Sequence, residues 1–176
     1  ALLCDVSQVS FADYESVSLQ KQQVGFCASL SLADALAVDD RARRDIHDAL
    51  VGVAMGLQHH DDVLDWEDDW QNGGAWAMCL ARRHAVWDAA WLRQRRAADV
   101  RGALLASGVL ASMMAMAESR FRQARDASLA LGAIRLARWA DERRATCSKL
   151  AGAERAAPGY TLRAHRLRYW QQMVLE

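Results

Sequence analysis

The residues best suited to chemistry form an acidic cluster in the first half of the chain. Five aspartates, Asp61, Asp62, Asp65, Asp68 and Asp69, lie within nine positions. On a helix, Asp61 and Asp65 project from one face and their negative charges repel each other. A divalent cation reverses the sign of that interaction, and Mg²⁺ is commonly held by one or two carboxylates together with substrate phosphates. The spacing therefore predicts a magnesium site, with Asp61, Asp62 and Asp65 as the metal ligands.

A solvated acidic face is the alternative interpretation of the same cluster. The residues directly upstream argue against it, because Gly52, Val53, Gly56 and Leu57 are small or apolar. A helix with such residues on several sides is packed against neighbours over most of its surface. We therefore expect the aspartates to point into an enclosed region.

Composition predicts an all-α protein. The chain has 176 residues, about half of them apolar, and a single proline, Pro158. Ala, Leu, Arg, Gln and Met are frequent, and these residues lose little side-chain freedom in a helix. We expect one helical domain over residues 1–176 without a flexible linker.

Charge and cysteine content exclude several classes of protein. The formal net charge is zero, so nothing draws the whole molecule to nucleic acid or to an anionic membrane. The apolar stretches are shorter than the roughly 20 residues that a membrane span requires. The four cysteines, Cys4, Cys27, Cys79 and Cys147, are scattered, and we interpret them as reduced core residues of a cytoplasmic protein.

Helical periodicity divides the chain into segments that would position the cluster. The second segment, capped by Asp40 and stopped by Asn72-Gly73-Gly74, carries the aspartates. Gly102 and Gly108 weaken the prediction of one unbroken helix in the fourth segment. The predicted helices are 11–36, 40–72, 75–96, 97–131, 133–150 and a basic helix over 161–175.

Two segments resemble motifs of the trans-prenyl diphosphate synthases, which belong to the class I isoprenoid synthase superfamily. Residues 57–65 read L-Q-H-H-D-D-V-L-D, similar to the second aspartate-rich motif F-Q-x-x-D-D-x-x-D. Residues 14–22 resemble the upstream segment Y-x-x-x-x-x-x-K-T, whose lysine binds diphosphate. Lys21 falls on that lysine, although the chain has only one other, Lys149.

The resemblance implies an antiparallel helical bundle of the class I type and a role for each matching residue. Asp61 would ligate Mg²⁺ directly, with Asp62 and Asp65 acting through water or as further ligands. Lys21 and Gln22 would bind the substrate diphosphate, and Gln58 would orient the first aspartate or the diphosphate. Magnesium and Lys21 would stabilise the negative charge on the departing pyrophosphate. Lys21 and Asp61 would then face one cavity from adjacent helices.

Other matches are shorter. Arg168-Tyr169 resembles the Arg-Tyr pair that holds diphosphate in many class I terpene cyclases and would bind substrate, but a solvated basic helix end explains the same residues. Trp66 and Trp70 would line an apolar cavity that keeps water from the carbocation, or would belong to an ordinary core.

The sequence also departs from the family pattern. The first aspartate-rich motif is not found, the threonine after the lysine is replaced by Gln22, and a lysine expected about ten residues beyond Asp65 is replaced by Ala75 or its neighbours. The resemblance therefore covers about residues 13–74 by motif, and we expect a fold that is incomplete at its N-terminus. Residues 65–73 look like bacterial terpene-synthase-like proteins and, more distantly, squalene or phytoene synthases. We therefore place cyclisation of a prenyl diphosphate slightly ahead of chain elongation.

Two further alternatives remain at this stage. One is a non-catalytic helical subunit that kept one metal-binding wall and regulates or completes a partner synthase. For either kind of protein, a homodimer or a partner chain would supply the missing N-terminal part. A carboxylate-bridged di-metal bundle is suggested by His59 and His60 beside the aspartates, but the E-x-x-H pairs of such sites are absent from the sequence.

Overall fold

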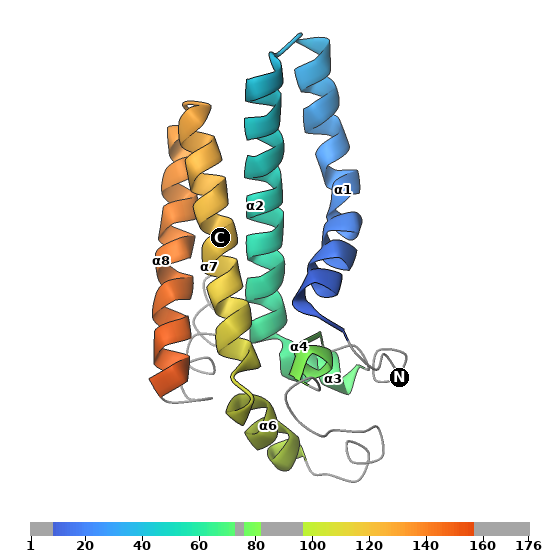
Figure 1. The fold of residues 1–176 in the computed structure, drawn as a ribbon, viewed down its shortest axis with the longest axis vertical. Coiled ribbons are helices and arrows are strands. Elements are labelled where there is room, and N and C mark those ends of the chain that lie inside the picture. The colour runs from blue at the N-terminus through green and yellow to red at the C-terminus, as the bar shows by residue number, and fades with distance from the viewer. Residues whose placement is uncertain (1–8, 73–75, 82–96, 157–176) are drawn as a thin grey trace, which may run out of the picture.

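The computed structural model describes residues 9–72, 76–81 and 97–156, and these ranges form helices without a strand (Figure 1). The all-α prediction is confirmed for this part of the chain. The bundle type of the class I isoprenoid synthases stays a prediction. The helices are α1 (Phe11–Ala35), α2 (Asp40–Leu64), α3 (Trp66–Gln71), α4 (Trp76–Ala81), α6 (Ala97–Ala106), α7 (Val109–Ala130) and α8 (Ile134–Ala156).

Two long helical hairpins form most of the structure. One hairpin consists of α1 and α2, the other of α7 and α8, and α2 lies beside α7 in the middle (Figure 1). The turns of both hairpins lie at the same end of the molecule. The short helices α3, α4 and α6 lie at the opposite end, where α2 ends and where α1 and α7 begin.

Side-chain caps fix where the first hairpin begins and turns. The Ser10 hydroxyl accepts from the Asp13 N–H, and the Asp13 carboxylate accepts from the Ser10 N–H, which satisfies two unpaired donors at the start of α1. Asp39 caps α2 by accepting from the N–H groups of Arg41 and Ala42. The cap therefore lies one residue before the predicted Asp40.

Two glycines let α2 and α7 approach closely. A Cβ atom at Gly52 would lie 2.6 Å from the backbone nitrogen of Ala124 and 2.7 Å from the carbonyl oxygen of Arg120. A Cβ atom at Gly56 would lie 2.8 Å from the ring of Phe121. All three distances are shorter than real Cβ contacts, so a larger residue at Gly52 would have to displace the α7 backbone and one at Gly56 would have to displace the Phe121 ring.

The prediction of one helix from Asp40 to the Asn72-Gly73-Gly74 stop is wrong, because α2 ends at Leu64. Asp65 has φ −103° and ψ 6°, outside helical geometry, and the chain restarts as α3 at Trp66. The Asp65 N–H still donates to the Asp61 carbonyl oxygen at 2.8 Å, which closes the last turn of α2. Asp68 and Asp69 therefore belong to a separate short helix and do not continue the face of Asp61 and Asp65.

The later segments follow the predictions in part. The predicted helix 97–131 is two helices, separated at Gly108, whose φ of 70° is in the left-handed region that favours glycine. The last described helix, α8, extends beyond the predicted 133–150. Within the predicted helix 75–96, the structure describes α4, and residues 82–96 lie outside the described ranges, as does the predicted helix 161–175.

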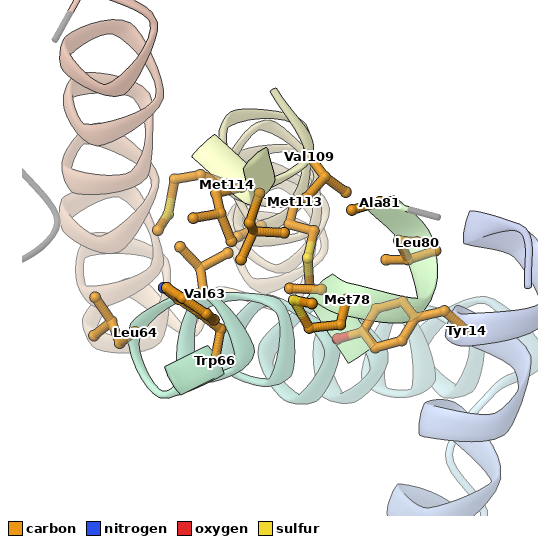
Figure 2. Packing of buried hydrophobic residues seen from close by; sticks show 14 of the residues in the cluster. Tyr14, Val63, Leu64, Trp66, Met78, Leu80, Ala81, Val109, Met113 and Met114 are labelled. Carbon is orange, nitrogen blue, oxygen red and sulfur yellow. The ribbon is translucent and has the colours of Figure 1, made fainter. Parts of the chain in front are cut away.

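The larger apolar cluster lies at the end of the molecule that holds the short helices. Figure 2 shows Tyr14 reaching from α1 into it, next to Met78 and Leu80 of α4, with Met113 and Met114 of α7 beyond. Trp66 is 7% exposed and belongs to this core, and Trp70 packs against it. A smaller cluster of Phe26, Val51 and Met55 joins α1 to α2 nearer the turn between these two helices.

Two further sequence expectations concern cysteines and membranes. Cys79 and Cys147 are buried as predicted, whereas Cys27 is exposed on α1, so the prediction of a core position is wrong for Cys27. Within the described ranges, no individual helix has both the length and the apolar character needed to cross a membrane. The segment Asp99–Ala106 together with α7 meets those criteria only as a pair bent by 53°.

Candidate functional site: a polar network between α1, α2 and α7

The structure brings the two sequence motifs together across the α1/α2 interface. The Gln22 side-chain amide donates to the Gln58 side-chain oxygen at 3.3 Å, and the Tyr14 hydroxyl donates to an Asp62 carboxylate oxygen at 2.5 Å. Each contact joins residues of the lysine-containing segment to residues of the aspartate-rich segment. The two segments thus lie on adjacent helices, and a cavity shared by Lys21 and Asp61 stays a prediction.

Asp62 is the most enclosed of the predicted metal ligands. It is 7% exposed, and both of its carboxylate oxygens already accept hydrogen bonds: Oδ2 from the Tyr14 hydroxyl, and Oδ1 from the Gln58 amide at 2.9 Å. Burial raises the pKa of Asp62 above its ordinary value, while the bonds from Tyr14 and Gln58 favour the charged form. Burial, followed by the Asp62 charge, also raises the pKa of Tyr14, which keeps the phenol protonated as a donor.

Asp61 and Asp65 are more accessible than Asp62. The Asp61 side chain is 50% exposed, and its Oδ1 lies 3.5 Å from Nδ1 of the buried His60. Asp65 is partly buried at the corner between α2 and α3. Across the residues that the structure describes, no group of three or more His, Cys, Asp or Glu side chains is arranged to hold a metal ion.

The donor chemistry nevertheless fits a magnesium ion that is shared with a substrate. Mg²⁺ prefers oxygen ligands, keeps several waters and is often bound by only one or two carboxylates plus phosphates. Asp61 and Asp65 stand one helical turn apart and are the pair that would hold it. Asp62 fits the role of ligand less well, because Tyr14 and Gln58 occupy its oxygens.

Lys21 lies next to this network. Its ammonium nitrogen is 6.0 Å from the centroid of the Trp76 ring, and Trp76 packs edge to face on Tyr14 at a centroid distance of 5.1 Å. Lys21 itself is exposed, which leaves its charge accessible to a ligand in solvent. Trp76 is next to Ala75 in the sequence, in the region where the resembled family pattern has a further lysine.

A second set of contacts at the site was not predicted from the sequence. The Glu15 carboxylate accepts from Nε and Nη2 of Arg120 at 2.9 and 2.6 Å, and its Oε1 lies 2.9 Å from Nε2 of His59. These contacts lower the pKa of Glu15 to about 2, with the hydrogen bond from His59 as the largest cause and Arg120 adding to it against the effect of burial. His59 is fully buried, and its ring centroid lies 5.0 Å from that of Tyr14. This His therefore serves an α1–α2–α7 contact, which weakens the di-metal alternative.

Sequence signals for these residues were weak but not all absent. Tyr14 opens the lysine-containing motif and could have been assigned a hydrogen-bonding role from that position. Glu15 and His59 stand beside motif residues, but neither spacing nor composition indicates that they meet. Arg120 is separated from Glu15 by 105 residues, so no local pattern connects them.

The remaining predicted site residues, Arg168 and Tyr169, lie outside the described ranges. The structure thus brings together Gln22, Gln58 and Asp62, with Lys21 beside Trp76, Asp61 half exposed and Asp65 at the end of α2. Comparison of the chain with models of known protein families, with curated proteins and with solved structures finds no match in any of the three.

Proposed function

We propose that this chain carries one metal- and diphosphate-binding wall of a Mg²⁺-dependent class I terpene synthase-like enzyme, which ionises an allylic prenyl diphosphate for cyclisation. The observation that carries the proposal is the contact between Gln22 and Gln58. It supports the proposal because Gln22, the neighbour of Lys21 on α1, touches α2 one turn before Asp61 and Asp62, and binding of one diphosphate by both segments would need them to be close.

The proposed roles follow from accessibility and charge. Asp61 and Asp65 would hold Mg²⁺ on the more exposed side of α2, and Lys21 would bind the diphosphate from α1. Bound magnesium would supply stabilisation of the negative charge that develops on pyrophosphate as the carbon–oxygen bond breaks. Asp62 would keep α1 and α2 in register through Tyr14 and Gln58. The neighbouring apolar cluster would limit the access of water to the carbocation. Arg168 and Tyr169 remain proposed substrate-binding residues.

A second candidate function is a non-catalytic subunit that completes a partner synthase. One observation favours it: among the described residues, no three-ligand metal group is formed. Prenyl chain elongation uses the same metal and diphosphate chemistry and is the alternative reaction. Both alternatives share the diphosphate-binding wall, so a binding experiment comes first and product analysis second.

The experiment measures the rise in melting temperature caused by pyrophosphate with and without Mg²⁺. We expect the wild-type protein to be stabilised only when both are present. Asp61→Asn should weaken this response about tenfold to a hundredfold in pyrophosphate concentration, because one charge-assisted contact contributes about 1.5–3 kcal/mol. Asp48→Asn is the matched control, since its side chain lies on the same helix and is 52% exposed against 50% for Asp61.

Lysine variants provide a second matched pair. Lys21→Ala should require more pyrophosphate for the same stabilisation, whereas Lys149→Ala, at an exposed position on α8, should behave as wild type. Incubation with farnesyl or geranylgeranyl diphosphate, with and without isopentenyl diphosphate, then separates cyclisation from elongation. A wild-type protein without any Mg²⁺-dependent response, or an Asp61→Asn protein with the full response, would refute the proposal.

A further inference from the structure

The position of α1 on α2 depends strongly on polar contacts near the N-terminal end of α1. Farther along α1, Val24 is 80% exposed and Leu32 is 59% exposed, and this part contacts α2 through the small cluster around Phe26, the Gln22–Gln58 hydrogen bond and the exposed Arg43–Asp34 ion pair. Near the start of α1, by contrast, Tyr14 and Glu15 are both hydrogen-bonded to other helices. Tyr14 and Glu15 therefore supply buried and partly buried hydrogen bonds that oppose displacement of this end of α1.

Arg120 connects α7 to this end of α1 through Glu15. Arg120 lies where α7 packs closely on α2: a Cβ atom at Gly52 would lie 2.7 Å from the Arg120 carbonyl oxygen. Helical side chains lean toward the N-terminus of their helix. For Arg120 that direction is toward the end of the molecule where α1 begins (Figure 1). Its guanidinium meets Glu15 in a two-point contact at 2.9 and 2.6 Å, a geometry that fixes orientation as well as distance.

We propose that Arg120 is a positioning residue for the candidate site: through Glu15 it fixes α1 so that the Tyr14 hydroxyl stays on Asp62. Tyr14 and Glu15 are consecutive on one rigid helix, so a rotation or shift of α1 that releases Glu15 also moves Tyr14. Hydrogen bonds weaken steeply with distance and angle, so a small movement is enough to break a bond of this kind. The link to ligand binding rests on the proposed function. The link to Tyr14 does not.

Arg144 offers a matched control within the same chain. It is 27% exposed against 30% for Arg120, and it forms ion pairs with Asp141 at 2.9 Å and Glu118 at 3.6 Å, as Arg120 does with Glu15. Those partners lie on α7 and α8, so the ion pairs of Arg144 do not include α1. Removal of either guanidinium therefore breaks ion pairs, but only removal of the Arg120 guanidinium breaks an ion pair with α1.

The first measurement is the ¹³C resonance of the hydroxyl-bearing ring carbon in protein labelled on its three tyrosines. Tyr14→Phe identifies the Tyr14 signal by its loss. Arg120→Ala and Glu15→Gln should both shift this signal toward the position of a tyrosine in water, and Arg144→Ala should leave it unchanged. Glu15→Gln preserves side-chain shape and carries the test if Arg120→Ala does not fold. An unshifted Tyr14 signal in the folded variants, or an equal shift in Arg144→Ala, would overturn the proposal.

The second measurement is the pyrophosphate concentration that gives half of the Mg²⁺-dependent stabilisation. We expect this concentration to rise about tenfold in Arg120→Ala and less than twofold in Arg144→Ala, although both variants melt at lower temperature than wild type. A purely structural role would lower the melting temperature without changing the half-maximal concentration, and that result would remove Arg120 from the site. If pyrophosphate with Mg²⁺ does not stabilise the wild-type protein, the proposed function is wrong. The tyrosine signal still decides in that case whether Arg120 positions Tyr14.

Discussion

The two sides of α2 are built in different ways. Toward α7, α2 presents Gly52 and Gly56, and the helices meet backbone to backbone with Phe121 filling the adjoining space. Toward the start of α1, α2 presents Gln58, His59 and Asp62, whose partners are polar. The first interface is determined by shape, and the second by hydrogen bonds and charge.

This difference distinguishes the α2/α7 interface, which supports α2, from the α1/α2 interface, which carries the candidate site. Close apolar packing tolerates almost no change in volume, because interiors are packed as densely as organic crystals. Each hydrogen bond between partly buried side chains contributes less to the free energy of folding than such packing does. These bonds nevertheless fix the direction of the groups that take part. An α2 helix held rigidly by α7 can therefore present its opposite face to α1 in one orientation. The side chains proposed for chemistry lie on or beside that second face.

The largest expected effect is at the α2/α7 interface. Gly52→Ala would place a methyl group 2.6 Å from the Ala124 nitrogen and 2.7 Å from the Arg120 oxygen, and neither backbone atom can move without displacing α7. We expect the free energy of unfolding to fall by about 3 kcal/mol or more, at the upper end for overpacked cores. Chemical denaturation measures it.

Gly25→Ala is the control for that substitution. Gly25 is an exposed position of α1, and a Cβ atom there would have nothing within 4 Å. Alanine at this position should therefore increase the free energy of unfolding by about 0.5–1 kcal/mol. Opposite signs at the two glycines would establish that shape controls one interface and not the outer face of α1. A neutral Gly52→Ala would mean that α2 and α7 lie farther apart than these distances require.

Much of the fold could be predicted from the sequence, because periodicity and capping are local. The spacing of apolar residues predicts the bounds of α1 closely, and the predicted cap Asp40 is one residue from the observed cap Asp39. The break at Asp65 was not predicted. No glycine or proline stands there, and the aspartate spacing itself fits an unbroken helix.

The candidate site was predictable only where its residues belong to one motif. Gln58, Asp61 and Asp62 follow from the aspartate-rich segment, and Lys21 from the lysine-containing segment. The different roles proposed for Asp61 and Asp62 could not be predicted from the sequence, because they depend on which carboxylate accepts the hydrogen bond from Tyr14 across the interface. Arg120 was unpredictable for the same reason, since its partner lies on a helix distant in sequence.

The next effect in size tests the polar interface through pH. The pKa of Glu15 is lowered from 4.5 to about 2, so the folded state favours its charged form. Its stabilisation is therefore present above about pH 4.5 and is lost as the pH falls toward 2. We expect the free energy of unfolding of wild type to be higher than that of Glu15→Gln by on the order of 2 kcal/mol at pH 7, after allowance for the partial exposure of Glu15. The difference should shrink between pH 4.5 and 2, and a constant difference across this window would contradict the assignment.

The smallest expected effect is at the other end of the α1/α2 hairpin. Arg43 of α2 contacts Asp34 of α1 at 3.1 Å, but both side chains are about half exposed, at 50% and 53%. Water and salt screen such a pair, which typically contributes less than about 1 kcal/mol. Arg43→Ala should therefore change the free energy of unfolding little, and the change should vanish in high salt. If Arg43→Ala instead destabilised the protein as much as Glu15→Gln, α1 would be held along its whole length, and the special role of its N-terminal contacts would be lost.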